Sequence, residues 1–267
     1  MRYCVSGRQS KSVMEKADEI RFQYKDLGRA FDYLEVFTDK TFIIDIPKDT
    51  EIDWNKLKMY ADKVDLILAL ADLKLAGECY VNQIKFYWVY PITTWYELRG
   101  IVELNPCYLF LGAPLSFSLS KVRECTDIPI RLCANLAYDA YIPRKEGICG
   151  QWIRPEDVDT YGAYVSAIDF VTDSLDSEKT LLDVYKFDKT WPGNLNLIIT
   201  NLNYNVDNRL IPEDLGETRM NCGQRCMDRG TCHLCDNGVK FANKVRDGYY
   251  AIRRKKNDIN FHNNTKE

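Results

Sequence analysis

The chain has 267 residues, of which 46% are hydrophobic and 28% are charged. A chain of this length and composition builds a full hydrophobic core without disulfide staples, which excludes a small disulfide framework. The formal net charge of −3 gives no global positive field that would gather nucleic acid.

The N-terminal residues MRYCVSGRQSKSVMEK lack the apolar stretch of a signal peptide. The longest apolar run, VDLILALA at 64–71, is too short to span a bilayer. We therefore expect a cytoplasmic protein with no membrane partner. Six scattered cysteines are expected to be reduced structural thiols: Cys4, Cys79, Cys107, Cys125, Cys133 and Cys149.

The N-terminal region allows two interpretations. Residues 11–28 can be read at helical spacing, whereas EIRFQY at 19–24 places Ile20, Phe22 and Tyr24 at strand spacing. We favour a strand at 19–24, followed by a helix over 28–37. RYCVS at 2–6 is then left as an extra strand or a cap.

Seven further apolar runs follow, and their Ile, Leu, Val and aromatic content is typical of buried parallel strands. They are TFIIDIP (41–47), DLILALA (65–71), KFYWVYP (85–91), CYLFLGAP (107–114), IPIRLCAN (128–135), QWIRP (151–155) and AIDFV (167–171). Helices fit between most of them. One is predicted over 53–64, and Pro155 with Glu156 and Asp157 indicates another helix start.

Eight parallel strands with helical crossovers predict a compact (β/α)8 barrel of the TIM type, with an open doubly wound sheet as the alternative. Beyond residue 171 the pattern changes. SEKTLLDVYKFDKTW at 177–191 reads as a helix, and LNLIITNL at 195–202 reads as helix or strand. We expect a barrel-like domain at 1–200, a cysteine-rich metal-binding appendage packed on it at 201–250, and a polar tail at 251–267.

The most specific motif is Cys222-x3-Cys226-x5-Cys232-x2-Cys235. Thiolates this close in sequence can converge on one ion, because short turns present two sulfurs each to a tetrahedral centre. Zinc and an iron–sulfur cluster both remain open, since the five-residue gap is shorter than a usual zinc-finger spacer. Two local disulfides or free thiols are the alternative.

If the barrel is right, a ligand binds at the carboxyl ends of its strands. Arg131 and Arg154 are flanked by apolar strand residues, where arginine seldom lies without an anionic partner. With Asn135 they are predicted to bind an anionic small molecule or a nucleotide, although a structural carboxylate could be that partner instead. Other polar residues expected at this mouth, some of them as helix caps, are Asp45, Lys48, Asp72, Tyr90, Ser116, Glu156, Asp169 and Asp173.

The sequence contains no G-x-S-x-G, GxxxxGK[ST] or GxGxxG motif and has two histidines. Serine or cysteine triad hydrolysis is therefore not expected, and the catalytic residues stay unknown. Acid–base chemistry would fall to carboxylates, lysine, tyrosine or a metal cofactor.

The strand pattern of about 19–171, followed by the cysteine cluster, resembles the peptidase U32 family. That family includes iron–sulfur proteins linked to RNA or quinone hydroxylation. The resemblance is architectural, and it carries over Cys222, Cys226, Cys232 and Cys235 as cluster ligands. It implies a metal- or iron–sulfur-dependent barrel enzyme acting on an anionic small molecule, a nucleotide or RNA. The competing hypothesis is a non-catalytic, zinc-stabilised interaction or structural protein that docks a protein partner.

Overall fold

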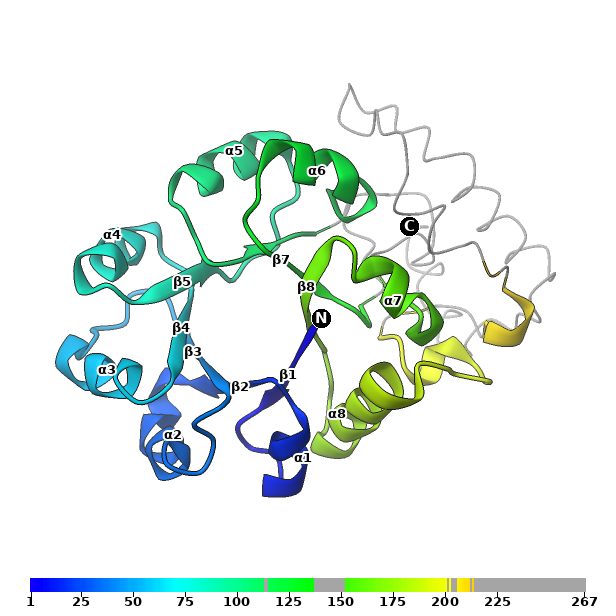
Figure 1. Ribbon diagram of the computed structural model, residues 1–267, viewed down its shortest axis with the longest axis horizontal. Helices are drawn as coiled ribbons and strands as arrows, with labels where there is room; N and C mark the ends of the chain where they lie inside the picture. The colour runs from blue at the N-terminus through cyan, green and yellow to red at the C-terminus, as the bar shows by residue number, and fades with distance from the viewer. Residues whose placement is uncertain (113–114, 137–151, 201, 203–205, 212, 214–267) are drawn as a thin grey trace, which may run out of the picture.

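The computed structural model describes residues 1–267 except 113–114, 137–151, 201, 203–205, 212 and 214–267. Parallel strands and helices alternate along the described chain, and the strands lie inside a ring of helices (Figure 1). The strands are β1 (Arg2–Ser6), β2 (Glu19–Gln23), β3 (Thr41–Ile46), β4 (Asp65–Leu70), β5 (Lys85–Trp88), β6 (Leu109–Phe110), β7 (Ile130–Cys133) and β8 (Val165–Asp169).

The sheet closes on itself. Its strand order is β5-β4-β3-β2-β1-β8-β7-β6, and every ladder between named strands is parallel. The two ends of this order meet at a parallel bridge between Tyr87 and Tyr108, where the Cys107 amide also donates to the Phe86 carbonyl at 2.8 Å. The fold is therefore the predicted (β/α)8 barrel of the TIM type and not an open doubly wound sheet.

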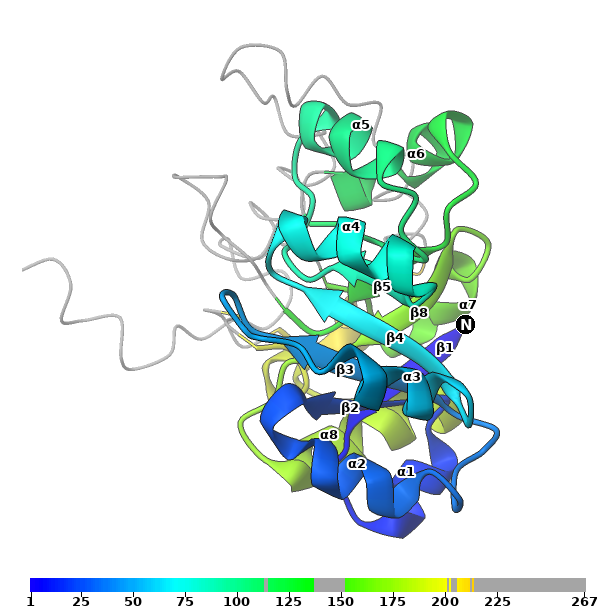
Figure 2. The same cartoon turned by 90° about the vertical axis from the view of Figure 1, so that its left-hand side faces the viewer.

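The helices cover the outside of the strands, as the side view also shows (Figure 2). They are α1 (Lys11–Lys16), α2 (Leu27–Tyr33), α3 (Trp54–Ala61), α4 (Leu73–Asn82), α5 (Trp95–Glu103), α6 (Leu119–Cys125), α7 (Val158–Tyr161) and α8 (Leu175–Leu182). Several begin at a side-chain cap: Asp53 accepts from the Lys56 amide, and Asp72 from the Lys74 amide. Such caps satisfy amides that have no partner within the helix.

Two strand assignments differ from the sequence prediction. RYCVS is a strand, as one of the two alternatives predicted, but it is not additional to the barrel, because it forms β1 and pairs with both β2 and β8. QWIRP was wrongly predicted as a barrel strand. Within it, Trp152 makes an isolated antiparallel bridge to Asn135, and Pro155 begins a 3-10 turn, Pro155–Asp157. Proline lacks the amide that a central strand needs, which ends any strand there.

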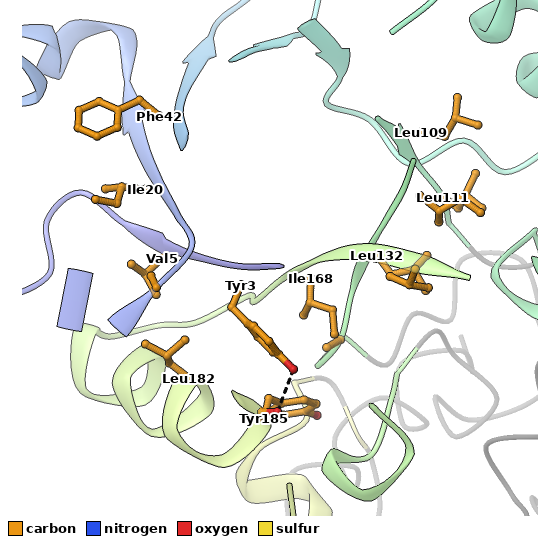
Figure 3. Packing of buried hydrophobic residues seen from close by; sticks show 14 of the residues in the cluster. Tyr3, Val5, Ile20, Phe42, Leu109, Leu111, Leu132, Ile168, Leu182 and Tyr185 are labelled. Carbon is orange, nitrogen blue, oxygen red and sulfur yellow. Dashed lines mark hydrogen bonds between the residues drawn. The ribbon is translucent and has the colours of Figure 1, made fainter. Parts of the chain in front are cut away.

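The segment after the barrel packs back onto it. α8 continues into a π-helical turn, Asp183–Asp188. The Tyr185 hydroxyl donates to the Ile153 carbonyl at 2.6 Å, and the Tyr3 hydroxyl donates to the Tyr185 carbonyl at 3.1 Å (Figure 3). The run at 195–202 is neither of the predicted elements, since it forms a 3-10 turn, Leu195–Leu197, and a bridge from Thr200 to Leu136.

The barrel has two buried regions, because successive side chains of a strand point to opposite faces. The larger, which we call the shell, lies between strands and helices and includes Val5, Ile20, Phe42, Leu132 and Ile168 (Figure 3). The smaller apolar cluster faces the barrel interior, here called the lumen. It comprises Cys4, Ile43, Ile67, Ala69, Tyr87, Tyr108 and Ala167.

Five of the six scattered cysteines are described, and they are free thiols: Cys4, Cys79, Cys107, Cys125 and Cys133. Among the described residues, no helix combines the length and apolarity needed to cross a membrane. The cysteine cluster and the polar tail lie outside the described residues, and of the predicted appendage only 202, 206–211 and 213 are described. The predicted domain boundaries therefore stay predictions.

Candidate functional site

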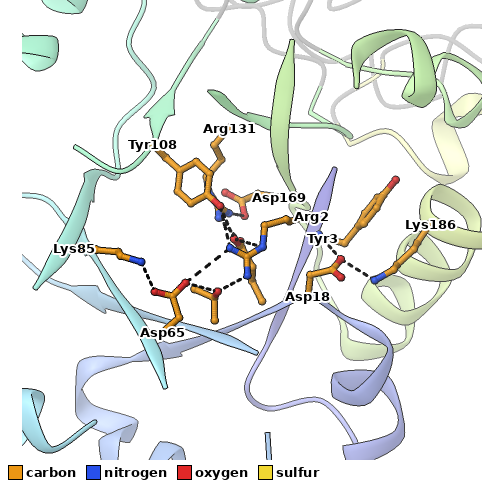
Figure 4. A network of polar contacts seen from close by, with 11 residues as sticks. Arg2, Tyr3, Asp18, Asp65, Lys85, Tyr108, Arg131, Asp169 and Lys186 are labelled. Carbon is orange, nitrogen blue, oxygen red and sulfur yellow. Dashed lines mark hydrogen bonds and ion pairs between the residues drawn. The ribbon is translucent and has the colours of Figure 1, made fainter. Parts of the chain in front are cut away.

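The lumen holds a buried ion-pair network centred on Arg131 of β7 (Figure 4). Arg131 is 0% exposed. Its Nη1 donates to Asp169 Oδ1 of β8 at 2.5 Å, and its Nη2 donates to the Glu19 carboxylate of β2. The guanidinium carbon also lies 5.1 Å from the ring centroid of Tyr87 and 4.6 Å from that of Tyr108. Burial of this cation is therefore offset by two carboxylates and two aromatic faces.

The network continues toward the amino ends of the strands. The Tyr108 hydroxyl donates to Glu19 Oε1 at 3.0 Å, and Arg2 Nη1 donates to the Tyr108 hydroxyl at 3.4 Å. Asp65 accepts from Thr41 at 2.9 Å and from Lys85 at 2.7 Å (Figure 4). Burial, followed by the nearby Glu19 charge, raises the pKa of Tyr108 to about 12, so this hydroxyl is a neutral hydrogen-bonding group at neutral pH.

Arg21 of β2 extends the network toward the carboxyl ends. Its Nη2 donates to the Tyr87 hydroxyl and, at 3.3 Å, to Asp169 Oδ2. Its Nε lies 3.5 Å from Asp45 Oδ1, and Gln23 donates to the other oxygen of Asp45 at 2.7 Å. Asp169 is thus held between two guanidinium groups, one deep in the lumen and one at its carboxyl end.

The two carboxyl groups beside Arg21 differ in proton affinity. Burial favours the neutral form of Asp169, but the guanidinium groups of Arg131 and Arg21 outweigh it and lower the pKa of this carboxyl. For Asp45, burial prevails over the Arg21 charge and raises the pKa. Asp169 is therefore a fixed anion, whereas Asp45 is the carboxyl of this pair that takes up a proton first.

A cavity of about 340 Å³ opens above Arg21 and Asp169. Its walls come from the carboxyl ends of β1, β2 and β8 and from the loops that follow, the position where TIM barrels bind ligands. We call it the mouth cavity. Its charged lining residues are Arg8, Arg21, Lys25, Asp26, Arg29, Asp169 and Glu178.

Most of these charges are already paired. Arg8 Nη2 donates to Asp26 at 2.9 Å, and Glu178 accepts from the Ser6 amide at 2.8 Å and from Gln9 Nε2 at 2.7 Å. Lys25 and Arg29 are exposed, and neither forms an ion pair within the described parts of the chain. The rim of the mouth cavity therefore carries two cations available to an anion from solution.

The thiol at the base of the mouth cavity, Cys4, is buried. Burial raises its pKa well above the usual value, despite the opposing charge of Arg21. It is therefore a neutral thiol at neutral pH and not an activated nucleophile, in agreement with the absence of a cysteine–histidine motif in the sequence.

The three residues predicted to bind the anion lie in different surroundings. Arg131 is in the lumen network, whereas Arg154 donates from Nε and Nη2 to the two oxygens of Asp157, each at 2.7 Å. These arginines share no carboxylate partner. Asn135 donates to the Val171 carbonyl at 2.7 Å and accepts from the Val171 amide at 2.8 Å. Their roles as ligand contacts stay predictions, and each has the internal partners described here.

The other predicted mouth residues divide by role. Asp45 and Asp169 face the lumen at Arg21, whereas Asp72 caps α4. The α8 cap is Ser174 and not Asp173. Cys222, Cys226, Cys232 and Cys235 lie outside the described residues. Within the described part of the chain, no three potential metal-ligating side chains gather at one point.

Sequence reasoning missed Glu19, Arg21, Lys25 and Arg29. The signal for the first two was present in EIRFQ, where Glu19, Arg21 and Gln23 alternate with apolar Ile20 and Phe22. In a strand whose apolar face packs against helices, the alternate polar residues must enter the lumen. Lys25 and Arg29 follow β2 in the loop and helix after it, and they carry no comparable pattern.

No protein-family model and no curated protein matches this chain. Among solved structures, it is similar to 3-keto-L-gulonate-6-phosphate decarboxylase from Vibrio cholerae O1 biovar El Tor, with 9% identity, coverage of 72% of this chain and 98% of that chain, and a TM-score of 0.45. A 4-hydroxy-2-oxoglutarate/2-dehydro-3-deoxyphosphogluconate aldolase matches with 10% identity, 73% and 92% coverage and a TM-score of 0.41.

Tryptophan synthase from Mycobacterium tuberculosis matches with 14% identity, 68% of this chain, 89% of that chain and a TM-score of 0.38. Similarities at this level add nothing about substrate or reaction. The barrel assignment stands on the strand order and registers of the chain itself.

Proposed function

We propose that this protein is a TIM-barrel enzyme that binds an anionic small molecule or the phosphate of a nucleotide in the mouth cavity. The observation that supports the proposal is the charge arrangement there. Lys25 and Arg29 carry unpaired positive charge at the rim, above a floor on which Arg21 is fixed by Asp169 and Tyr87. With Nη2 engaged by these two groups, the guanidinium of Arg21 is held in place and can offer Nη1 for a charge-assisted hydrogen bond to a carboxylate or phosphate.

Within this proposal, Arg131 is a positioning residue. It has no exposed surface, and its contact with Asp169 holds the carboxylate that in turn orients Arg21. Asp45 is the proposed proton-transfer group, because it contacts Arg21 and Gln23, which line the mouth cavity, and because burial raises its pKa.

Thermal-shift and calorimetric titrations with inorganic phosphate, ribose 5-phosphate, AMP and citrate test the binding step. We expect at least one of these anions to raise the melting temperature. The double variant Lys25→Ala/Arg29→Ala should weaken that binding roughly tenfold, given about 0.5–1 kcal/mol for each exposed ion contact. Lys11→Ala/Lys58→Ala removes the same charge from exposed positions on α1 and α3 and serves as the matched control.

Two results would count against the proposal. If no anion in the panel shifts the melting temperature, the mouth cavity is not an anion site. If the control variant loses as much affinity as Lys25→Ala/Arg29→Ala, the anion responds to net charge and not to this cavity.

We also propose that Cys222, Cys226, Cys232 and Cys235 bind one zinc ion or one iron–sulfur cluster. Their spacing supports this. Elemental analysis of anaerobically purified protein should find the metal, and Cys222→Ser/Cys235→Ser should lose it while Cys125→Ser, an exposed free thiol, retains it. Visible absorbance would identify a cluster and support the U32-like enzyme, whereas colourless zinc protein would support a structural role. Unchanged metal content in the double variant would show that these cysteines are not the metal ligands.

The second candidate function is a non-catalytic interaction protein. The observation that favours it is a group of exposed aromatic and aliphatic side chains on the outside of the barrel, among them Tyr80, Val81 and Tyr96. Exposed apolar surface of this kind marks association sites in many proteins. Failure of every anion to bind, together with bound zinc, would favour this candidate.

A further inference from the structure

An apolar groove of about 780 Å³ lies on the outer surface along α5. Its lining includes Leu73, the first residue of α4, then Trp88 of β5 and Tyr90 in the loop after it, and ends with Glu103 and Leu104 at the end of α5. The helices α4 and α5 are neighbours in the ring around the barrel (Figure 1). Tyr96 is 88% exposed, Leu73 55% and Tyr90 54%. Large apolar side chains gathered at this level of exposure indicate a surface that another molecule covers.

The exposed side of α5 has the shape of a helix-docking face. Tyr96, Gly100 and Leu104 follow at intervals of four residues, so they form one stripe along the helix. Gly100 is at the middle of this stripe, and apart from its chain neighbours and the backbone of its own helix no described atom lies within 4 Å of the position that a Cβ would occupy there. A second helix backbone can therefore approach closely at Gly100, between the larger side chains at either end.

The charges beside this stripe favour a second copy of the same helix. Arg99 and Glu103 are exposed, and neither forms an ion pair with any residue in the described ranges. With a rise of about 1.5 Å per residue, antiparallel helices crossing at Gly100 place Tyr96 of one copy opposite Leu104 of the other. Arg99 then lies about 3 Å along the axis from Glu103 of the second copy, within reach of its side chain. Both pairs occur twice because the arrangement is two-fold.

We propose that two copies of this chain associate through α5, antiparallel and crossing at Gly100, with the apolar groove covered by the second copy. Each Tyr96 packs against the groove of the other subunit, and each Arg99 pairs with the Glu103 opposite. Self-complementarity is what an isologous dimer requires of a single surface. The interface is on the outside of the barrel, apart from the mouth cavity, so it does not depend on the proposed ligand.

Sedimentation equilibrium of the full chain between about 1 and 100 µM tests the dimer. Gly100→Arg places a long charged side chain at the crossing point, and it also removes an exposed helical glycine, which does not endanger folding. We expect dimer for the parent protein and monomer for Gly100→Arg. Gly77→Arg is the matched control, since Gly77 is an exposed glycine of α4 with equally open surroundings, and this variant should remain dimeric.

Charge reversal tests the orientation of the two helices. Arg99→Glu and Glu103→Arg should each raise the dimer dissociation constant at least tenfold, because each places like charges opposite one another. Arg99→Glu/Glu103→Arg restores opposite pairs in the two-fold arrangement and should return the constant to within about threefold of the parent value. A parent protein that is monomeric throughout this range, a dimeric Gly100→Arg variant, or a double reversal no better than the single ones would overturn the proposal.

Discussion

The lumen and the shell of this barrel are buried by different means. The shell is filled by aliphatic and aromatic side chains such as Phe42 and Leu132, so its stability comes from apolar area removed from water. The lumen contains charged groups in addition to its small apolar cluster, and Arg131 is its centre. Branched aliphatic residues usually dominate a TIM-barrel interior. The lumen of this barrel differs from that pattern, because it buries an ion-pair network among charged side chains of different strands.

The largest effect on stability is expected when the central cation of the lumen, Arg131, is removed. Arg131→Met keeps much of the side-chain volume but leaves Glu19 and Asp169 buried without their shared partner. We expect the free energy of unfolding to fall by about 3–5 kcal/mol, measured by urea denaturation. A loss below about 1 kcal/mol would show that water or a neighbouring cation replaces the guanidinium, and that the lumen is not a tightly coupled network.

Acid should destabilise the lumen through Asp169. Its folded-state pKa is lowered by Arg131 and Arg21, below the unfolded value of about 3.9. The stability it contributes is therefore complete above about pH 5 and is lost as the pH falls through the folded-state pKa. Asp169→Asn should flatten the fall in unfolding free energy between about pH 5 and 3.

Asp45 should change the pH dependence of the unfolding free energy in the opposite direction, so it serves as the control for Asp169. Because burial raises its folded-state pKa, protonation of Asp45 stabilises the fold as the pH falls. Asp45→Asn removes that gain and should make the acid-induced loss steeper. Identical pH profiles for the two variants would mean that these carboxyl groups do not differ in the way the structure indicates.

A conservative substitution in the shell measures how much apolar packing contributes to the free energy of unfolding. Ile168 precedes Asp169 on β8, is fully buried and faces the shell. Ile168→Val removes one methylene and should cost about 0.5–1.5 kcal/mol in the same urea experiment. A cost as large as that of Arg131→Met would indicate that packing, and not the ion pairs, limits stability at this part of the barrel.

The smallest effect is expected at the amino end of the lumen. Lys85 pairs with Asp65 at 2.7 Å, but the Lys85 side chain is 60% exposed. Lys85→Met should therefore change the free energy of unfolding by no more than about 1 kcal/mol, and less at high salt. A loss comparable to that of Arg131→Met would extend the tightly coupled network to this end of the barrel.

The barrel could be predicted from the sequence because apolar runs such as TFIIDIP and DLILALA are typical of parallel strands that are buried on both faces. The prediction left the strand at 2–6 outside the barrel and placed a barrel strand at 151–155, for related reasons. RYCVS is short and begins with a charge, yet pairing with β2 and β8 makes it a central strand. QWIRP is apolar, but Pro155 ends it and its Trp152 and Ile153 are buried outside the strand ladder.

The site was less predictable than the fold, because it depends on which side chains from distant strands meet. The position of Arg131 within an apolar strand predicted an anionic partner, and in the structure it has two carboxylate partners. One of them, Glu19, is 112 positions away in sequence, and no local pattern connects the two. Lys25 and Arg29 became candidates after the folded chain placed them at the rim of a cavity.

The charged side chains of the lumen also affect the nascent chain before the barrel closes. β1 pairs with β8, and Arg2 lies opposite Ala167 in that register, so the barrel cannot close until Ala167 has been synthesised. Roughly 80 positions separate the end of β5 from Ala167, and their synthesis takes on the order of ten seconds at about 5–20 residues per second. During this interval the strands β1 to β5 present an open face to solvent. Because that face carries Arg2, Glu19, Arg21, Asp65 and Lys85 beside its few apolar side chains, we expect it to stay hydrated and to associate less readily than a purely aliphatic face.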